Sequence, residues 1–217
     1  MKGICLTLYC LLLLEVSCIA ANPTYPFLWD LHAGQWQTDF GKLNQGLNQN
    51  GLASFSNTLN TIGISLSNHL AFMSGRSRAF MNLDYTYIVP TISARNGTVS
   101  SILSGYALGM ALGKGLVRIK NYFGIKAFLG FQTGRMKLLW SDEALRINKA
   151  AYTNPFFSPQ LTLIPRFIFG HFSFGGRFGY QYDISKGRWR HSDGNLNAIG
   201  NAYMTGWVCE GIIGYAI

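Results

Sequence analysis

The chain has 217 residues and a mass of 24.1 kDa, the size of one ordinary domain or one compact barrel. Charged residues make up only 12% of it, aromatic residues 14%, and glycine contributes 25 residues. Because soluble domains carry about a quarter charged residues, this composition disagrees with a highly soluble cytosolic enzyme and excludes a disordered or coiled-coil protein. It fits many short strands in an apolar environment.

The N-terminus has the parts of a secretory signal peptide. Lys2 supplies a positive charge, residues 4–14 form an apolar run, and small residues follow within 17–21. The apolar run is too short for a membrane-spanning helix, and the small residues suit cleavage by signal peptidase. We therefore predict a cleaved signal peptide over residues 1–21 and one folded domain over residues 22–217.

Cleavage of the signal peptide would change the number of cysteines in the folded protein. Cleavage would remove Cys5, Cys10 and Cys18 and leave Cys209 as the single cysteine of the mature chain. One cysteine forms no internal disulfide and no cysteine-based metal site. A lipoprotein acylated at Cys18 is the alternative, although the acidic Glu15 fits that motif poorly.

The mature chain is strongly basic. Without Lys2 and Glu15 it holds 17 basic and 8 acidic residues, and the basic ones gather in predicted turns at 76–78, 114–120 and 186–190. Export argues against nucleic acid as the partner. Anionic lipid headgroups or lipopolysaccharide phosphates are the neighbours we expect, and simple solvated turn charges are the alternative.

Period-two alternation of apolar with polar or small residues dominates the rest of the chain. It is strictest over 79–89 and 172–183, where aromatic and aliphatic residues occupy one face. Such segments are typical of strands of about ten residues. Weaker examples occur at 62–66, 105–112, 123–132, 161–168 and 203–215, and a first strand within 25–37 would bring the number to eight.

The charges in these strands lie on the face without the aromatic residues, which is also rich in glycine and alanine. In a soluble sandwich or lipocalin that face would meet water, whereas in a membrane barrel it lines the interior and the aromatic face meets lipid. Small residues suit the crowded interior of a narrow barrel. We therefore predict an all-β fold, an eight-stranded antiparallel transmembrane up-and-down β-barrel.

The predicted connections alternate in length along the chain. Long ones are expected at 38–60, 90–100, 134–160 and 185–201, and short ones at 67–75, 113–120 and 170–171. Short periplasmic turns and long outward loops are the rule in outer-membrane barrels. Within the first long connection, Asp39 can cap a short helix with Phe40, Leu43 and Leu47 on one face, and a polar loop is the alternative.

With this strand pattern and the glycine-containing insert 39–47, the chain resembles the small eight-stranded outer-membrane β-barrel proteins of Gram-negative bacteria over residues 25–217. The resemblance implies an outer-membrane location, contact with outer-membrane lipid and lipopolysaccharide, and handling by the barrel assembly machinery during insertion. It departs from that family at the C-terminus, where Ile217 stands in place of the usual aromatic residue.

Six inward charges are the candidate site. Unpaired charges in a dry lumen would be very costly, so we expect them to pair and lock the barrel; a gate that opens to conduct ions is the alternative. The six are Asp84, Lys126, Arg166, Arg177, Asp183 and Glu210.

No cofactor motif and no metal-ligand spacing is present, and the other histidines, at 32, 69 and 171, are scattered. The leading hypothesis is a non-enzymatic protein with a structural role or with a surface partner at its long loops, above all 134–160. The alternative is a lipid A-modifying hydrolase that uses His191, followed by Ser192 and Asp193. Adjacent loop residues do not form the hydrogen-bonded chain of a triad. A secreted lipocalin-like carrier is the third hypothesis.

Overall fold

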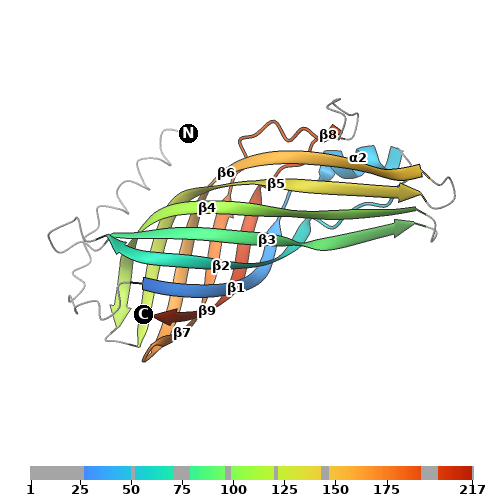
Figure 1. Ribbon diagram of the computed structural model, residues 1–217. Coiled ribbons are helices and arrows are strands. Elements are labelled where there is room, and N and C mark those ends of the chain that lie inside the picture. Colours follow the sequence, from blue (N-terminus) through green and yellow to red (C-terminus); the bar gives the residue numbers. More distant parts are fainter. Residues whose placement is uncertain are drawn as a thin grey trace.

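A computed structural model gives the structure of the chain (Figure 1) and describes residues 27–49, 52–70, 79–95, 99–119, 122–142, 147–191 and 200–216. The predicted signal peptide lies outside these residues. The strands are β1 (Phe27–Gln37), β2 (Thr58–Leu70), β3 (Ala79–Arg95), β4 (Val99–Ile119), β5 (Phe123–Asp142), β6 (Ile147–Phe169), β7 (Phe172–Gln181), β8 (Arg190–His191) and β9 (Gly206–Ala216), and the helix is α2 (Gly41–Gln49).

Eight of the strands form a closed antiparallel barrel, as predicted. Each strand from β1 to β6 pairs with the next along the chain, β7 pairs with β9, and β9 pairs with β1. The two-residue β8 adds to the outer part of β6. Closure leaves no exposed edge around the ring, so the backbone can be satisfied in lipid. No helix among the described residues is long and apolar enough to cross a membrane.

The direction in which the side chains point is also confirmed. Leu83 and Tyr85 on β3 and Phe178 on β7 are 43 to 49% exposed, whereas Asp84 and Arg177 beside them are buried. The same alternation extends around the ring, with an apolar outer surface and a polar interior in the middle of the barrel. An apolar surface on this scale marks contact with a membrane or with another protein, and around a closed barrel it is typical of contact with lipid.

The lengths of the central strands differ from the prediction. Strands β4, β5 and β6 have 21, 20 and 23 residues, and Figure 1 shows β3 to β6 running well past β1, β7 and β9 as a curved sheet. Most of the predicted long connections 90–100 and 134–160 is therefore strand, and the prediction that these two connections are long was wrong: only 96–98 and 143–146 separate the strands there. We call this end of the barrel, where α2 also lies, the extended end, and the opposite end, with the β6–β7 turn, the turn end.

The β6–β7 turn is as short as predicted. It consists of Gly170 and His171, and Gly170 adopts a φ of 60°, which favours glycine. The helix predicted in the first long connection is present as α2. The backbone N–H of Gly41 donates to Asp39 Oδ1 at 3.2 Å, the cap expected from the sequence.

The outward position of Leu83 makes a testable prediction. Replacing Leu83 by Arg should cost about 2–4 kcal/mol of folding free energy in lipid, because the new charge would face the acyl chains near the membrane midplane. The measurement is equilibrium unfolding of the protein in lipid vesicles. Ile92→Arg is the matched control, since Ile92 points outward on β3 at the extended end and is 68% exposed. Equal costs for the two variants would contradict the membrane assignment.

Candidate functional site

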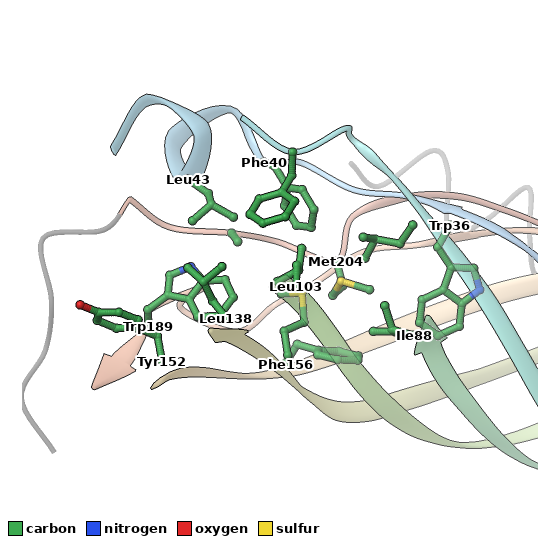
Figure 2. Packing of buried hydrophobic residues seen from close by; sticks show 14 of the residues in the cluster. Trp36, Phe40, Leu43, Ile88, Leu103, Leu138, Tyr152, Phe156, Trp189 and Met204 are labelled. Carbon is green, nitrogen blue, oxygen red and sulfur yellow. The ribbon is translucent and has the colours of Figure 1, made fainter. Parts of the chain in front are cut away.

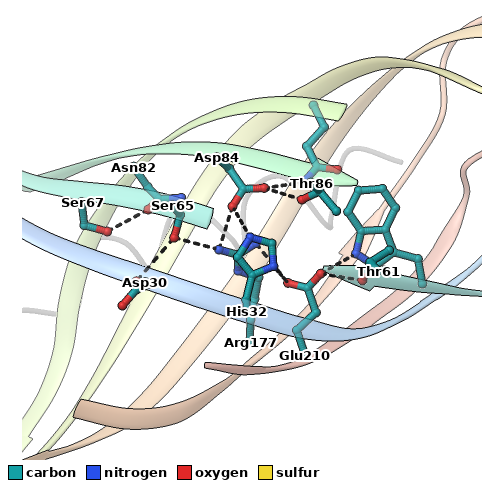
Figure 3. A network of polar contacts seen from close by, with 12 residues as sticks. Asp30, His32, Thr61, Ser65, Ser67, Asn82, Asp84, Thr86, Arg177 and Glu210 are labelled. Atoms are coloured by element: carbon teal, nitrogen blue, oxygen red, sulfur yellow. Dashed lines mark hydrogen bonds and ion pairs between the residues drawn. The ribbon is translucent and has the colours of Figure 1, made fainter. Parts of the chain in front are cut away.

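Arg177 lies at the centre of a buried charged network in the barrel lumen (Figure 3). Its Nη2 is 3.0 Å from Asp84 Oδ1, and its Nη1 is 3.1 Å from Glu210 Oε2. The three side chains come from β7, β3 and β9, and each is at most 4% exposed. The structure thus brings together three of the six charges that the sequence placed inside.

His32 of β1 lies against the same two carboxylates. Its Nε2 is 3.1 Å from Asp84 Oδ1, and its Nδ1 is 3.2 Å from Glu210 Oε2. Both ring nitrogens thus lie within ion-pair distance of a carboxylate oxygen, a position that suits a charged His32. Two cations then balance two anions, which is what a buried group of charges requires.

Neutral donors satisfy the other carboxylate oxygens. Glu210 Oε1 accepts from Trp36 Nε1 at 2.9 Å and from Thr61 Oγ1 at 3.0 Å. Asp84 Oδ2 accepts from Thr86 Oγ1 at 2.8 Å and lies 3.5 Å from Gln132 Nε2. Hydrogen bonds of this kind offset part of the cost of removing a carboxylate from water.

A second ion pair lies nearer the turn end. Arg166 binds Asp30 in a bidentate manner, Nη1 to Oδ1 at 2.7 Å and Nη2 to Oδ2 at 2.8 Å, and Ser173 Oγ accepts from Nη1 at 3.2 Å. Ser65 Oγ lies 3.4 Å from both Asp30 Oδ2 and Arg177 Nη2. It therefore connects the two ion-paired groups into one network that spans the middle of the lumen.

The other two predicted charges do not join these ion pairs. Lys126 places its ammonium nitrogen 3.9 Å from the centroid of the Phe80 ring. Asp183 lies beyond the end of β7, where its carboxylate accepts from the backbone N–H groups of Ser185 at 2.8 Å and Met204 at 2.9 Å. Asp183 thus shapes a connection at the extended end, away from Arg177.

An apolar cluster fills the lumen at the extended end (Figure 2). Trp36 reaches the charged network through its indole N–H, Phe40 and Leu43 come from the start of the α2 segment, and Trp189 comes from the connection after β7. All four side chains are at most 1% exposed. We call this cluster the apolar plug; its remaining members are Leu47, Leu52, Phe55, Leu59, Ile88, Leu103, Ala107, Met136, Leu138, Tyr152, Phe156, Ala202, Met204 and Val208.

Sequence reasoning missed two charged members of the network, Asp30 and His32. Both lie on β1, where Trp29 and Leu31 alternate with them and point outward. Period-two alternation over these four residues was the signal that could have placed Asp30 and His32 inside. Gly63 supports the site in another way: a Cβ there would lie 2.5 Å from the imidazole Cε1 of His32, so glycine leaves the room that the ring occupies.

Comparison with known proteins identifies the architecture. A major outer membrane protein from Thermus thermophilus superposes with a TM-score of 0.52 at 10% identity, over 90% of this chain and 100% of that one. The chain has the fold of an outer-membrane β-barrel. Ail, the attachment invasion locus protein of Yersinia pestis, gives a TM-score of 0.44 at 12% identity over 88% of this chain and 97% of its own. No protein-family model matches, and no curated protein matches in sequence.

The hydrolase hypothesis stays a prediction. On this outer-membrane barrel fold, His191 ends β8, and its backbone pairs with Tyr152 of β6. Ser192 and Asp193 lie outside the described residues. Mass spectrometry of lipid A from cells with and without the gene is the test, and altered acyl chains would favour the hydrolase.

The network predicts a strong effect for Glu210→Leu. The change leaves the Trp36 indole without an acceptor and Arg177 with one carboxylate instead of two, so we expect a loss of about 3–5 kcal/mol. Urea unfolding of the reconstituted barrel measures it. Gln132→Leu is the control, because it removes a neutral lumen side chain and one weak hydrogen bond, worth about 1 kcal/mol. Equal stability of wild type and Glu210→Leu would mean that the charges are solvated.

Proposed function

We propose that the protein is a non-enzymatic outer-membrane β-barrel with a closed lumen and a structural or surface-interaction role. The observation that supports this most is the filled interior of the barrel. Arg177, His32 and their carboxylates occupy the middle of the lumen, and the apolar plug occupies the extended end. Eight strands leave space for side chains but not for an aqueous channel as well.

The proposed orientation places the turn end in the periplasm and the extended end outside the cell. Support comes from the long connections 38–57 and 182–205 and the long strands β4 to β6 at the extended end, with the two-residue turn Gly170–His171 at the other end. The C-terminal strand β9 also ends at the turn end, where Ala216 pairs with Leu28 of β1. The segment 1–21 is proposed to direct export and to be removed.

The extended end is the part proposed to meet other molecules at the cell surface. The sheet there is backed by the apolar plug, so strands as well as connections offer a surface to a partner. Phe156 and Phe157 divide between the two faces of the sheet: Phe156 is buried in the plug, and Phe157 points outward and stacks on Phe131 with ring centroids 5.3 Å apart. The two rings therefore cannot act together as one anchor for a surface partner.

A closed lumen predicts the absence of steady ion conductance. Folded protein inserted into planar bilayers should leave the membrane at its background conductance, because the charged network and the plug block the path in series. A shift in gel mobility on boiling verifies that the sample is folded, and boiled protein is the control for nonspecific leakage. Steady, unitary currents from the folded form would contradict the closed lumen.

The proposed signal peptide predicts a mature chain that begins near Asn22 in the outer-membrane fraction. Leu11→Arg with Leu12→Arg would interrupt the apolar run and should leave uncleaved protein inside the cell. Leu11→Ala with Leu12→Ala keeps the run apolar and should be exported. N-terminal sequencing and cell fractionation are the measurements. Export of the arginine variant at the wild-type level would count against the signal peptide.

A further inference from the structure

Four basic side chains lie together on the outer surface of the extended end. Lys137 of β5 pairs with Thr153 of β6, and Thr153 pairs in turn with Arg190 of β8, so Lys137 and Arg190 lie on either side of Thr153 in one cross-strand row. Strands in a sheet are about 4.8 Å apart, which puts these two backbones about 10 Å from each other. Arg135 lies two residues from Lys137 on the same face of β5, and Arg188 two residues from Arg190.

All four side chains, here called the basic band, are exposed. Between Arg188 and Arg190 the chain buries Trp189 in the apolar plug, so the two arginines on either side of it point away from the lumen. No ion pair among the described residues involves any member of the band. Of the acidic side chains that the structure describes, Asp39 alone is exposed, and it lies beside α2. Among the side chains that the structure describes, none therefore compensates the positive charge of the band.

The segment that carries Arg188 and Arg190 is held in place before any ligand binds. The backbone N–H groups of Tyr182 and Ile184 donate to the carbonyls of Pro159 and Phe157 on β6, both at 3.0 Å, and the carbonyl of Gly187 accepts from Ala202 N at 3.0 Å. The segment is therefore tied to β6 near both of its ends and to Ala202 between them, with Trp189 in the plug. Binding a ligand would thus cost little ordering entropy, the usual benefit of preorganisation.

Apolar side chains lie next to the basic band on the side toward the turn end. Phe157 and Ile184 are 39% and 58% exposed, and Phe131 stacks on Phe157. One face of β5, β6 and the segment after β7 therefore presents apolar side chains below and cations above. That order matches a lipid whose acyl chains lie in the membrane and whose anionic groups lie just outside it.

We propose that this face is a binding site for a phosphorylated glycolipid of the outer leaflet, with its phosphates on the basic band and its acyl chains along Phe131, Phe157 and Ile184. Four cations within a small area suit a headgroup with several phosphates better than the single phosphate of a phospholipid. Arginine also binds phosphate oxygens in a bidentate manner, which favours a specific pose. The inference rests on the proposed orientation, with the extended end outside the cell.

The test measures retention of three probes by the folded, full-length barrel in nanodiscs of neutral lipid. The probes are bisphosphorylated lipid A, the same lipid after removal of its phosphates, and phosphatidylglycerol, and native mass spectrometry counts the lipids that stay bound. Wild type should prefer bisphosphorylated lipid A over both others. Arg135→Gln with Arg190→Gln should weaken that binding about 30-fold at low salt, which corresponds to about 1 kcal/mol for each cation near an anionic surface.

Lys42→Gln with Lys114→Gln is the matched control, because it removes two positive charges outside the band, from α2 and from the part of β4 near the turn end. It should keep the wild-type preference. Equal retention of all three probes, a preference for phosphatidylglycerol, or equal effects of the two double variants would overturn the proposal. Failure of the wild type to fold and insert, seen as no gel shift on boiling, would instead count against the proposed outer-membrane function.

Discussion

The balance of charge around Arg177 is the constraint on which the rest of the interior depends. A guanidinium and an imidazole face two carboxylates in a space lined by strands, and each side chain comes from a different strand: β1, β3, β7 and β9. Removing any one partner leaves a buried charge uncompensated, which costs far more than the pair contributes by existing. The main effect of the network is therefore to determine which strands meet in the lumen, and its net contribution to stability is smaller.

Closure of the sheet and burial of the charges support each other. The β1–β9 pairing places His32 opposite Ile212 and Gly34 opposite Glu210, which fixes the height of the imidazole relative to the carboxylate. A slip of one residue in that register would turn His32 toward the lipid and break both of its contacts. The charged network thus disfavours wrong registers at the seam where the first and last strands meet, and that seam is the last contact along the chain that a barrel must make.

The sequence was sufficient for the barrel, the direction of its faces and four members of the network, because period-two alternation is a local signal. It could not pair Arg166 with Asp30, since those residues are 136 positions apart and their contact depends on the order of strands around the ring. The short helix α2 was predictable from Asp39 and its apolar face, yet its place in the plug was not. His32 was missed because β1 was the weakest strand in the pattern, so its outward partners Trp29 and Leu31 were not used to orient it.

The long strands β4 to β6 show how the two ends of the barrel differ. On β5 the inward positions change along the strand from Lys126 and Gln132 to Met136 and Leu138, while the outward positions change from Leu129 to Arg135 and Lys137. The alternation continues along β5, but the polar side chains move from the inner to the outer face. A rule that expects charges only on the inner face therefore predicts a loop for this segment.

The exchange of the two faces has a physical cause. Where lipid surrounds the barrel, the apolar residues must face outward and the interior can be ionic. Where water surrounds it, the same strands must carry their polar residues outward and bury apolar ones. Strand β5 thus follows the pattern of a membrane barrel at one end and that of a soluble sheet at the other, and Arg135 and Lys137 of the basic band lie on its outer face beyond that change.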